Sequence, residues 1–242
     1  MVPIRGIGGA DYHQWIRSWA GGKCHKDPSW KYVFWTDRDN RELFRTYLPQ
    51  YLETYDRMTV GVQRADMARY AILYIAGGVY VDLDFDCAKD FDELLQREDI
   101  RTKGAFISSE PWLQTLLLYG KETVACNAIM GSVPGHPLWL AMLDRIAQRI
   151  KKRQCAYSQI MICTGPMALD EEYRRDAMRS QVAMLSSDHF YPEIALNNVD
   201  NMKKPCESNK TKHASMTDRQ FKEACQIIHN YKVGTSLWTN NT

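Results

Sequence analysis

Three aspartates alternate with apolar residues at the end of a short hydrophobic run. The stretch 77–86 reads GGVYVDLDFD, so that one residue separates Asp82 from Asp84 and one separates Asp84 from Asp86. In an extended chain successive side chains point to opposite faces, and the three carboxylates would share one face. Carboxylates held this close repel one another, and a divalent cation removes that conflict. Oxygen ligands of this kind suit Mg²⁺ or Mn²⁺, which bind few carboxylates together with substrate phosphates.

A metal at this point suits a reaction in which a diphosphate leaves, because the cation offsets the charge that develops on the leaving oxygen. A calcium-binding loop is one alternative, since these three aspartates and Glu93 occupy positions 1, 3, 5 and 12 of an EF-hand loop. However, Cys87 stands where that loop requires glycine, and the residues before Asp82 read as a strand instead of a helix. A solvated strand end without a function is the other alternative.

A second pair of charged residues precedes this strand. The segment 65–76 is predicted to be a helix that ends at Gly77, because its apolar residues recur at helical spacing. Asp66 and Arg69 lie three residues apart and therefore on one face of that helix. The pattern places them opposite the apolar stripe formed by Met67, Tyr70, Ala71 and Tyr74. The pair is predicted either to hold a ligand or to form a surface salt bridge.

The elements that position these residues alternate between strand and helix patterns. Strands are predicted at residues 2–7, 32–35, 79–81, 105–107, 124–130 and 226–229. Helices are predicted around residues 12–19, 43–44, 65–76 and 139–150, and a long polar loop at about 197–215. The alternation predicts an α/β fold with a mostly parallel central sheet flanked by helices on both faces. Ligands of such sheets bind beyond the carboxyl ends of the strands, which is where Asp82 falls.

Composition narrows the class of protein. The chain has 242 residues without a linker-like segment, and we expect a single domain over 1–242. A formal net charge of +2 gives no electrostatic reason to expect nucleic acid as a partner. The seven cysteines form no C-x-x-C pair, which argues against zinc. No window is apolar enough to span a membrane, so membrane association would need a segment absent from this chain.

Two Asn-x-Thr triplets, at 209–211 and 240–242, slightly favour the secretory pathway. The expected location is therefore the Golgi or another lumen of the secretory pathway, with the cytoplasm as the alternative.

Several motifs together resemble one protein family. The segment 63–84, QRADMARYAILYIAGGVYVDLD, resembles the DxD-containing sugar-transferase region of glycosyltransferase family 32, which includes yeast-type Golgi mannosyltransferases and inositol-phosphoceramide mannosyltransferases. The resemblance continues, in order, through Trp35-Thr36-Asp37, Asn127 with GSVPGHP at 131–137, Thr164-Gly165-Pro166, and His229 followed by Ser236-Leu237-Trp238. Each motif by itself is weak, but all of them in one order are specific.

The resemblance implies a fold, a reaction and a cofactor. The fold would be the GT-A type nucleotide-binding sandwich. The enzyme would be a retaining glycosyltransferase that moves a hexose from a nucleotide-sugar donor, GDP-mannose or a UDP-sugar, to a hydroxyl of a glycan, glycolipid or protein acceptor. Its cofactor would be Mn²⁺ or Mg²⁺. A nucleotide-sugar hydrolase and a non-catalytic divalent-cation-binding module are the alternatives.

The resemblance also assigns roles around the Asp-x-Asp motif. Asp84 would ligate the metal directly, and Asp82 would contact the ribose and reach the metal through water. Asp66 and Arg69 would hold the donor sugar, so that these four residues form the catalytic set. The family's aromatic residue near the nucleobase has no counterpart at the start of this chain. We therefore assign no residue to the base.

A third part of the pattern lies in the C-terminal tail. The resemblance implies that the tail folds over the donor, with His229 or Ser236 near the metal. The indole N–H of Trp238 would donate to a phosphate oxygen of the donor. Such a flap would exclude water and so favour transfer over hydrolysis. A tail that only packs a tryptophan onto the domain is the alternative.

Overall fold

The computed structural model describes residues 16–21, 29–85, 87, 89–190, 196–207 and 217–230. The predicted strand at residues 2–7 lies outside these ranges. No helix in the described part is both long and apolar enough to cross a membrane. That residues 1–242 form a single domain stays a prediction.

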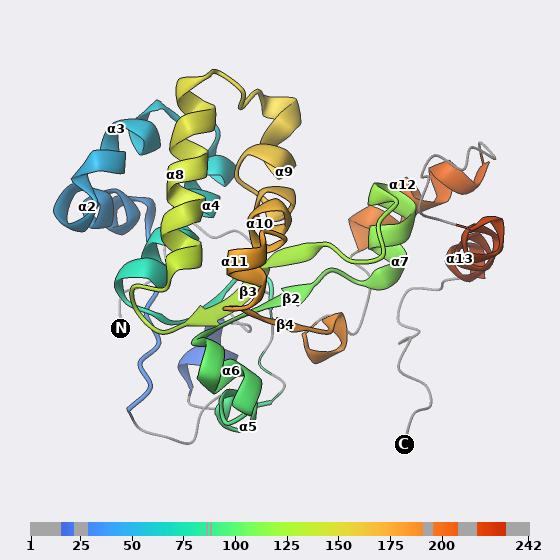
Figure 1. Cartoon of the computed structure of the whole chain (residues 1–242), viewed down its shortest axis with the longest axis horizontal. Coiled ribbons are helices and arrows are strands. Elements are labelled where there is room, and N and C mark those ends of the chain that lie inside the picture. The colour runs from blue at the N-terminus through green and yellow to red at the C-terminus, as the bar shows by residue number, and fades with distance from the viewer. Residues whose placement is uncertain are drawn as a thin grey trace.

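The centre of the fold is a small mixed sheet (Figure 1). Its strands are β1 (Gly78–Val81), β2 (Ala105–Ser109), β3 (Ala125–Ser132) and β4 (Ala183–Leu185), in the order β1-β3-β2-β4. β3 runs antiparallel to both β1 and β2, whereas β2 and β4 are parallel. The α/β class is therefore confirmed, but the prediction of a mostly parallel sheet is wrong for these strands.

The physical reason is the connection between β2 and β3. Two short helices, α7 (Trp112–Gln114) and the π-helix η1 (Thr115–Tyr119), join these strands. They lie at the ends of β2 and β3 instead of crossing a sheet face, so the chain returns antiparallel (Figure 1). An alternation of strand and helix patterns predicts a crossover, and here the connecting helices do not make one.

Helices lie on both faces of the sheet (Figure 1). One layer holds α2 (Asp37–Tyr47), α3 (Pro49–Arg57), α4 (Gly61–Ile75), α8 (Pro137–Lys151), α9 (Ile160–Cys163), α10 (Pro166–Tyr173) and α11 (Asp176–Arg179). The opposite side holds α5 (Asp92–Leu95) and α6 (Glu98–Lys103). Short 3₁₀ turns, η2 (Tyr157–Gln159) and η3 (Ser187–His189), precede α9 and follow β4. Two further helices, α12 (Leu196–Glu207) and α13 (Asp218–Asn230), pack on η1 beyond the far end of β2 and β3.

Local signals explain where the helices next to the site begin. Thr36 caps α2, because its hydroxyl accepts from the Asp39 backbone N–H at 3.2 Å while the Asp39 carboxylate accepts from the Thr36 N–H at 3.0 Å. The helix predicted around residues 43–44 is thus confirmed as part of α2. The α8 helix begins with Pro137 after His136, whose imidazole accepts from the Leu138 N–H at 3.3 Å.

The main core lies between this helical layer and the sheet. Trp139 of α8 is fully buried, and its indole N–H donates to the Ser132 hydroxyl at 2.6 Å. The ring stacks on Tyr70 of α4 with 6.0 Å between centroids. These contacts fix α4 and α8 against β3, and α4 carries the charged pair singled out by the sequence.

Two predicted elements differ from the structure. Residues 32–35 adopt no regular strand, and the predicted strand at 226–229 belongs to helix α13. A short apolar run fits either period, and here Phe221, Ala224 and Ile228 show the helical one, because all three are buried in one cluster. Much of the predicted loop at 197–215 is also helical, since α12 covers residues 196–207. A Cys206–Cys225 disulfide joins α12 to α13.

The structure shows disulfide bonds that the spacing of the cysteines does not predict. Cys155 and Cys163 form a second disulfide, Cys87 is also disulfide-bonded, and Cys126 is a buried free thiol. Structural disulfides persist in oxidising compartments and are rare in the cytosol. The pairing therefore favours the secretory location over the cytoplasmic one.

Gly131, within the GSVPGHP motif, is required by packing across β2 and β3. A Cβ at this position would overlap the ring of Phe106, which is itself buried at 1% exposure. We expect Gly131→Ala to lower the free energy of unfolding by about 1–3 kcal/mol, the usual cost of overpacking. Gly61→Ala is the matched control, because a Cβ there meets nothing within 4 Å. Urea unfolding of both variants measures the difference, and equal stabilities would contradict this account.

Candidate functional site

Helix α4 is buried along most of its length, and this brings its charged residues inside the protein. Asp66 is 3% exposed and Arg69 is 6% exposed. The alternative of a surface salt bridge is therefore wrong. The helix ends before Gly77 and Gly78, whose φ angles of 65° and 86° turn the chain directly into β1. This tight turn places the end of β1 beside the middle of α4.

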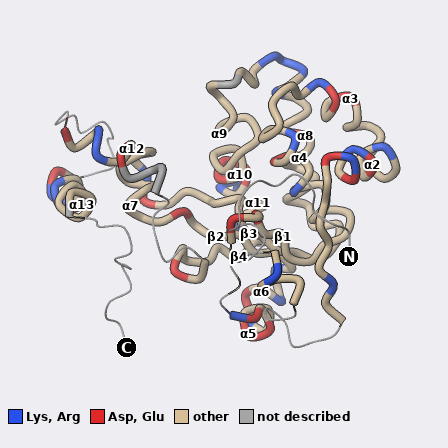
Figure 2. The backbone as a smooth tube through the Cα atoms, turned by 180° about the vertical axis from the view of Figure 1, so that it is seen from behind, with Lys and Arg blue, Asp and Glu red and all other residues tan. Residues whose placement is uncertain are grey.

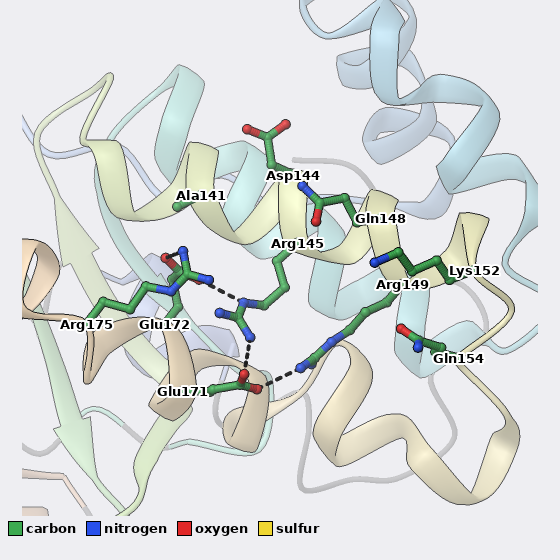
Figure 3. Close-up of a pocket in the computed structure, with 10 residues that line it drawn as sticks. All are labelled: Ala141, Asp144, Arg145, Gln148, Arg149, Lys152, Gln154, Glu171, Glu172 and Arg175. Carbon is green, nitrogen blue, oxygen red and sulfur yellow. Dashed lines mark hydrogen bonds and ion pairs between the residues drawn. The ribbon is translucent and has the colours of Figure 1, made fainter.

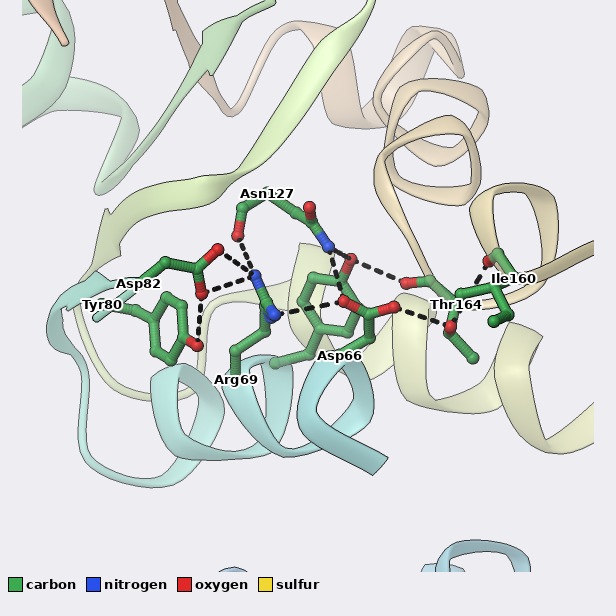
Figure 4. Close-up of polar contacts among 8 residues, drawn as sticks. Asp66, Arg69, Tyr80, Asp82, Asn127, Ile160 and Thr164 are labelled. Carbon is green, nitrogen blue, oxygen red and sulfur yellow. Dashed lines mark hydrogen bonds and ion pairs between the residues drawn. The ribbon is translucent and has the colours of Figure 1, made fainter. Parts of the chain in front are cut away.

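Arg69 joins three segments of the chain (Figure 4). Its guanidinium pairs with Asp66 at 3.2 Å and with Asp82 at 3.0 Å. It also donates to the backbone oxygen of Asn127 at 2.8 Å and lies over the Tyr80 ring, 4.9 Å from the centroid. Burial acts to lower the pKa of Arg69, but the electrostatic interactions with Tyr80, Asp82 and Asp66 outweigh burial and raise this pKa. The guanidinium is therefore a permanent cation that draws these residues together.

Asp66 is held by groups from two other elements. The Asn127 side-chain amide donates to its Oδ1 at 3.0 Å, and the Thr164 hydroxyl donates to its Oδ2 at 2.8 Å. Burial raises the pKa of Asp66, while Arg69, Thr164 and Asn127 act against that rise. Because a carboxylate can accept about four hydrogen bonds, these three contacts leave room for one more donor.

Tyr70 links the same two elements from the neighbouring position of α4. Its hydroxyl donates to the backbone oxygen of Thr164 at 2.9 Å and accepts from the Asn127 amide at 3.1 Å. The side chain is fully buried, and burial raises the pKa of this phenol, so that it remains a donor. Sequence reasoning counted Tyr70 only as part of an apolar stripe. The one signal it carried was a polar hydroxyl within an otherwise apolar face.

A bulge in β3 frees its backbone for this site. The pairing of β2 with β3 shifts between Ile107, which faces Met130, and Ser108, which faces Cys126. Residues 127–129 therefore face no residue of β2, and the backbone oxygens of Asn127 and Ala128 accept from Arg69 and from the Asp82 N–H. Bulges often redirect side chains next to active sites, and this one turns Asn127 toward α4.

The Asp-x-Asp motif follows β1 as a turn. The Phe85 N–H donates to the Asp82 backbone oxygen at 3.4 Å, so residues 83 and 84 form the bend. The prediction that the aspartates share one face of an extended strand is therefore wrong, and Asp86 lies outside the described residues. The sequence spacing was read as extended, but the strand ends at Val81.

Asp82 and Asp84 are nevertheless close enough to influence each other. The Tyr80 hydroxyl donates to Asp82 at 2.8 Å. Partial burial and the negative charge of Asp82 raise the pKa of Asp84, although part of the Asp84 side chain is exposed to solvent. The described part of the chain holds no group of three His, Cys, Asp or Glu residues suited to a metal. Two neighbouring carboxylates that repel each other still fit a divalent cation whose remaining ligands come from a phosphate.

A cavity of about 500 Å³ opens beside these residues. Arg69, Tyr80 and Asp82 form part of its wall, together with an aromatic segment at residues 30–35. Its other aromatic walls are Trp19 and Phe91, which stack on each other with 5.6 Å between centroids. Trp19 also packs against a buried cluster that includes Phe91.

The aromatic wall was missed because residues 32–35 were predicted to be a buried strand. The cavity volume of about 500 Å³ is within the usual range for small-molecule sites.

His229, from the C-terminal part of the predicted site, is not brought to this cavity. His229 is exposed on α13, which packs on α12 and η1 at the opposite end of the protein from α2 and α4 (Figure 2). Ser236 and Trp238 lie outside the described residues. The structure thus gathers Asp66, Arg69, Asp82 and Asp84, and adds Tyr70, Tyr80, Asn127 and Thr164.

Tyr70→Phe tests whether this buried network stabilises the fold. The variant leaves the Thr164 carbonyl without its donor, and we expect a loss of about 1–3 kcal/mol in the free energy of unfolding. Tyr55→Phe is the control, because the Tyr55 hydroxyl is buried without a hydrogen-bond partner, so that its removal is expected to be neutral or stabilising. Urea unfolding of the two variants gives the comparison. A Tyr70→Phe protein as stable as the Tyr55→Phe protein would refute the network.

Comparisons with known proteins show what part of this chain is similar to them. Residues 10–101 match the family described as glycosyltransferase sugar-binding region containing DXD motif. The chain is 32% identical to inositol phosphoceramide mannosyltransferase 2 of Schizosaccharomyces pombe, over 61% of this chain and 39% of that protein. It is equally identical to the mannosyl phosphorylinositol ceramide synthase SUR1 of Saccharomyces cerevisiae, over 61% and 35%. An uncharacterized glycosyltransferase, L373, of Acanthamoeba polyphaga mimivirus is 30% identical over 67% and 60%.

The chain thus spans between about a third and three fifths of the length of these curated relatives. Among solved structures, the PaToxG glycosyltransferase superimposes with a TM-score of 0.46 at 12% identity, covering 92% of this chain and 80% of that one. Residues 10–101, which the family model matches, include the charged pair on α4 and the Asp-x-Asp turn after β1. The resemblance inferred from the sequence is confirmed: residues 10–101 match the DXD-containing sugar-binding region of glycosyltransferases, and the chain is similar to the yeast mannosyltransferases.

Proposed function

We propose that this chain is the catalytic part of a GT-A type glycosyltransferase, which moves a hexose from a nucleoside-diphosphate sugar to an acceptor hydroxyl. The observation that carries the proposal is the pairing of Asp66 with Arg69 and of Arg69 with Asp82, the last two of which line a cavity of about 500 Å³. The family match of residues 10–101 supports it independently.

The cavity suits the nucleoside part of the donor. Its aromatic wall offers flat apolar surface to a base and its polar wall offers a cation to a phosphate. Arg69 faces this space, and Asp82 is positioned to accept from a ribose hydroxyl. The remaining acceptor position of Asp66 is available to the sugar, whereas the Asn127 amide N–H groups already donate to Asp66 and Tyr70. Direct contact of Asp66 with the sugar therefore requires a hydroxyl that enters the cluster.

Asp84 and Asp82 are the residues that would hold Mn²⁺ or Mg²⁺. The cation would neutralise charge on the leaving diphosphate. The turn at residues 83 and 84 leaves Asp84 exposed, where it can meet a metal that arrives with the donor. The proposed ligand set is completed by phosphate oxygens and by Ser236 or His229 of the tail. His229 would have to leave its place on α13 to take part.

We infer the donor and the acceptor from the activities for which the relatives are named. Two of them are named for mannosyl transfer to inositol phosphoceramide, so we favour GDP-mannose as donor and a glycolipid as acceptor. UDP-sugars and glycan or protein acceptors are the other choices. Retention of configuration and a place in the secretory lumen also belong to the proposal, and the disulfides support the latter.

A screen of nucleotide-sugars by thermal unfolding tests the proposal. The protein is heated with each donor, with Mn²⁺ and with a chelator, and the correct donor is expected to raise Tm only with the metal. Product analysis with and without a lipid acceptor then separates a transferase from a nucleotide-sugar hydrolase. If no nucleotide-sugar raises Tm and none is turned over, the proposed function is wrong.

Asp84→Asn tests the metal site directly. Losing a liganding carboxylate removes leaving-group stabilisation, and we expect turnover to fall by at least ~10²-fold while Tm stays unchanged. The control is Asp218→Asn, an exposed aspartate at the start of α13 that is expected to leave turnover intact. Full turnover of Asp84→Asn in the presence of chelator would exclude the site.

A further inference from the structure

A buried aspartate on α10 holds the start of the strand that carries Asn127. Asp170 is 1% exposed, and its Oδ1 accepts from the backbone N–H of Ala125 at 3.1 Å. Ala125 is the first residue of β3, two positions before Asn127. A hydrogen bond from a backbone amide to a buried charge is stronger than one between neutral groups. This bond therefore fixes the strand just before its bulge.

Two basic residues strengthen the same attachment. The other carboxylate oxygen of Asp170 accepts from Arg174 at 2.8 Å and from Lys121 at 3.2 Å. Arg174 in turn donates to the backbone oxygen of Thr123 at 2.6 Å. Residues 121–125 are thus bound to α10 at three points.

The bulge makes Asn127 depend on this attachment. Residues 127–129 face no residue of β2, and the next pair that β3 makes with β1 is Ile129 with Val81. Between Cys126, which pairs with Ser108 of β2, and Ile129 the strand is held by its contacts with the site itself. A shift at Ala125 would therefore move the Asn127 amide, which donates to Asp66 and Tyr70.

We propose that Asp170 is a positioning residue for sugar transfer, which acts by setting the place of Asn127 through the start of β3. The proposal rests on the proposed function for its catalytic part. Asp170 does not line the cavity and touches neither Asp66 nor Asp82, so its effect must pass through β3. The chemistry of its role is that of a fixed anion that holds a backbone N–H, without any exchange of protons.

Glu172 supplies a matched control on the same helix (Figure 3). It is also 1% exposed and paired with arginines, Arg145 at 2.7 Å and Arg175 at 3.2 Å. Arg145 belongs to α8, and Arg175 follows the end of α10. Both line a charged groove of about 360 Å³, in which Glu171 also pairs with Arg145 and Arg149. Glu172 is therefore a comparably buried carboxylate that pairs with Arg145 and Arg175 and not with the start of β3.

The experiment compares Asp170→Asn with Glu172→Gln in the full chain. Both variants lose a buried charge, and both are expected to lower Tm. In Asp170→Asn the single amide oxygen turns to the donors Arg174 and Lys121, which leaves the NH2 group facing the Ala125 N–H, so the start of β3 is released. We expect kcat for transfer to fall by about 10-fold or more in Asp170→Asn, because small misplacements of positioned groups cost this much. Glu172→Gln is expected to keep the wild-type kcat.

A double-mutant cycle decides whether the effect passes through Asn127. If it does, Asp170→Asn introduced into an Asn127→Ala protein lowers kcat by less than about twofold, because the group it positions is already absent. If the two losses multiply, Asp170 acts by another route and the proposal is overturned. Equal kcat values for Asp170→Asn and Glu172→Gln would overturn it as well.

Nuclear magnetic resonance separates this proposal from the proposed function. The side-chain amide signals of Asn127, identified by their loss in Asn127→Ala, are expected to shift in Asp170→Asn and to stay in place in Glu172→Gln. Unshifted signals in Asp170→Asn overturn the positioning role even in an active protein. An inactive wild-type protein with shifted signals instead refutes the proposed function and leaves the link from Asp170 to Asn127 established.

If Asp170→Asn does not fold, Arg174→Gln and Arg175→Gln repeat the comparison. Arg174→Gln removes the bond to Thr123 and the bond that holds Oδ2 of Asp170, and so loosens the carboxylate that holds the Ala125 N–H. Arg175 is its neighbour and pairs with Glu172 instead. We expect only Arg174→Gln to shift the Asn127 signals and lower kcat, and identical behaviour of the two variants would overturn the proposal.

Discussion

The buried guanidinium of Arg69 is the constraint on which the site depends. It pairs with Asp66 on its own helix, with Asp82 after β1 and with the backbone of Asn127 in β3. Removing a charge from water costs several kcal/mol, so such a group persists only where its partners are complete. Each of the three segments is thus held at one point, and any arrangement that separates them leaves a charge unpaired. The buried ion pairs of Arg69 therefore fix the relative positions of these segments more than they stabilise the fold.

Irregular backbone around that cation gives the site its shape. The left-handed turn at Gly77 and Gly78 places β1 beside α4, and the bulge in β3 releases two carbonyl oxygens from the sheet. A regular sheet would have used those oxygens for pairing, and Arg69 would have lacked an acceptor. The aromatic segment at residues 30–35 likewise adopts no strand, which leaves it free to line the cavity. Deviations from regular structure are therefore concentrated where the protein is expected to bind its donor.

Much of the site was visible in the sequence because its signals are local. The helical stripe of α4, its glycine end and the strand at 79–81 were predicted correctly, as was the relation to DXD-containing glycosyltransferases. Asp66, Arg69 and Asp82 do come together, and their role in sugar transfer stays a prediction. The strand direction was mispredicted because the pattern of alternation does not say where a connecting helix packs. The α13 segment was read as a strand because a short apolar run fits both periods.

The amino-acid sequence alone determined the residue types, the helix that presents Asp66 and Arg69, and the acidic turn that follows one strand later. Spacing along a helix or strand fixes which side chains share a face, and this needs no tertiary contact. Only the tertiary structure decided that the α4 pair is buried, that Tyr70, Asn127 and Thr164 complete its hydrogen bonds, and that Asp170 holds β3. These partners lie 40 to 100 residues apart in the chain. Their meeting is set by packing and by the need to pair every buried polar group, which no local pattern encodes.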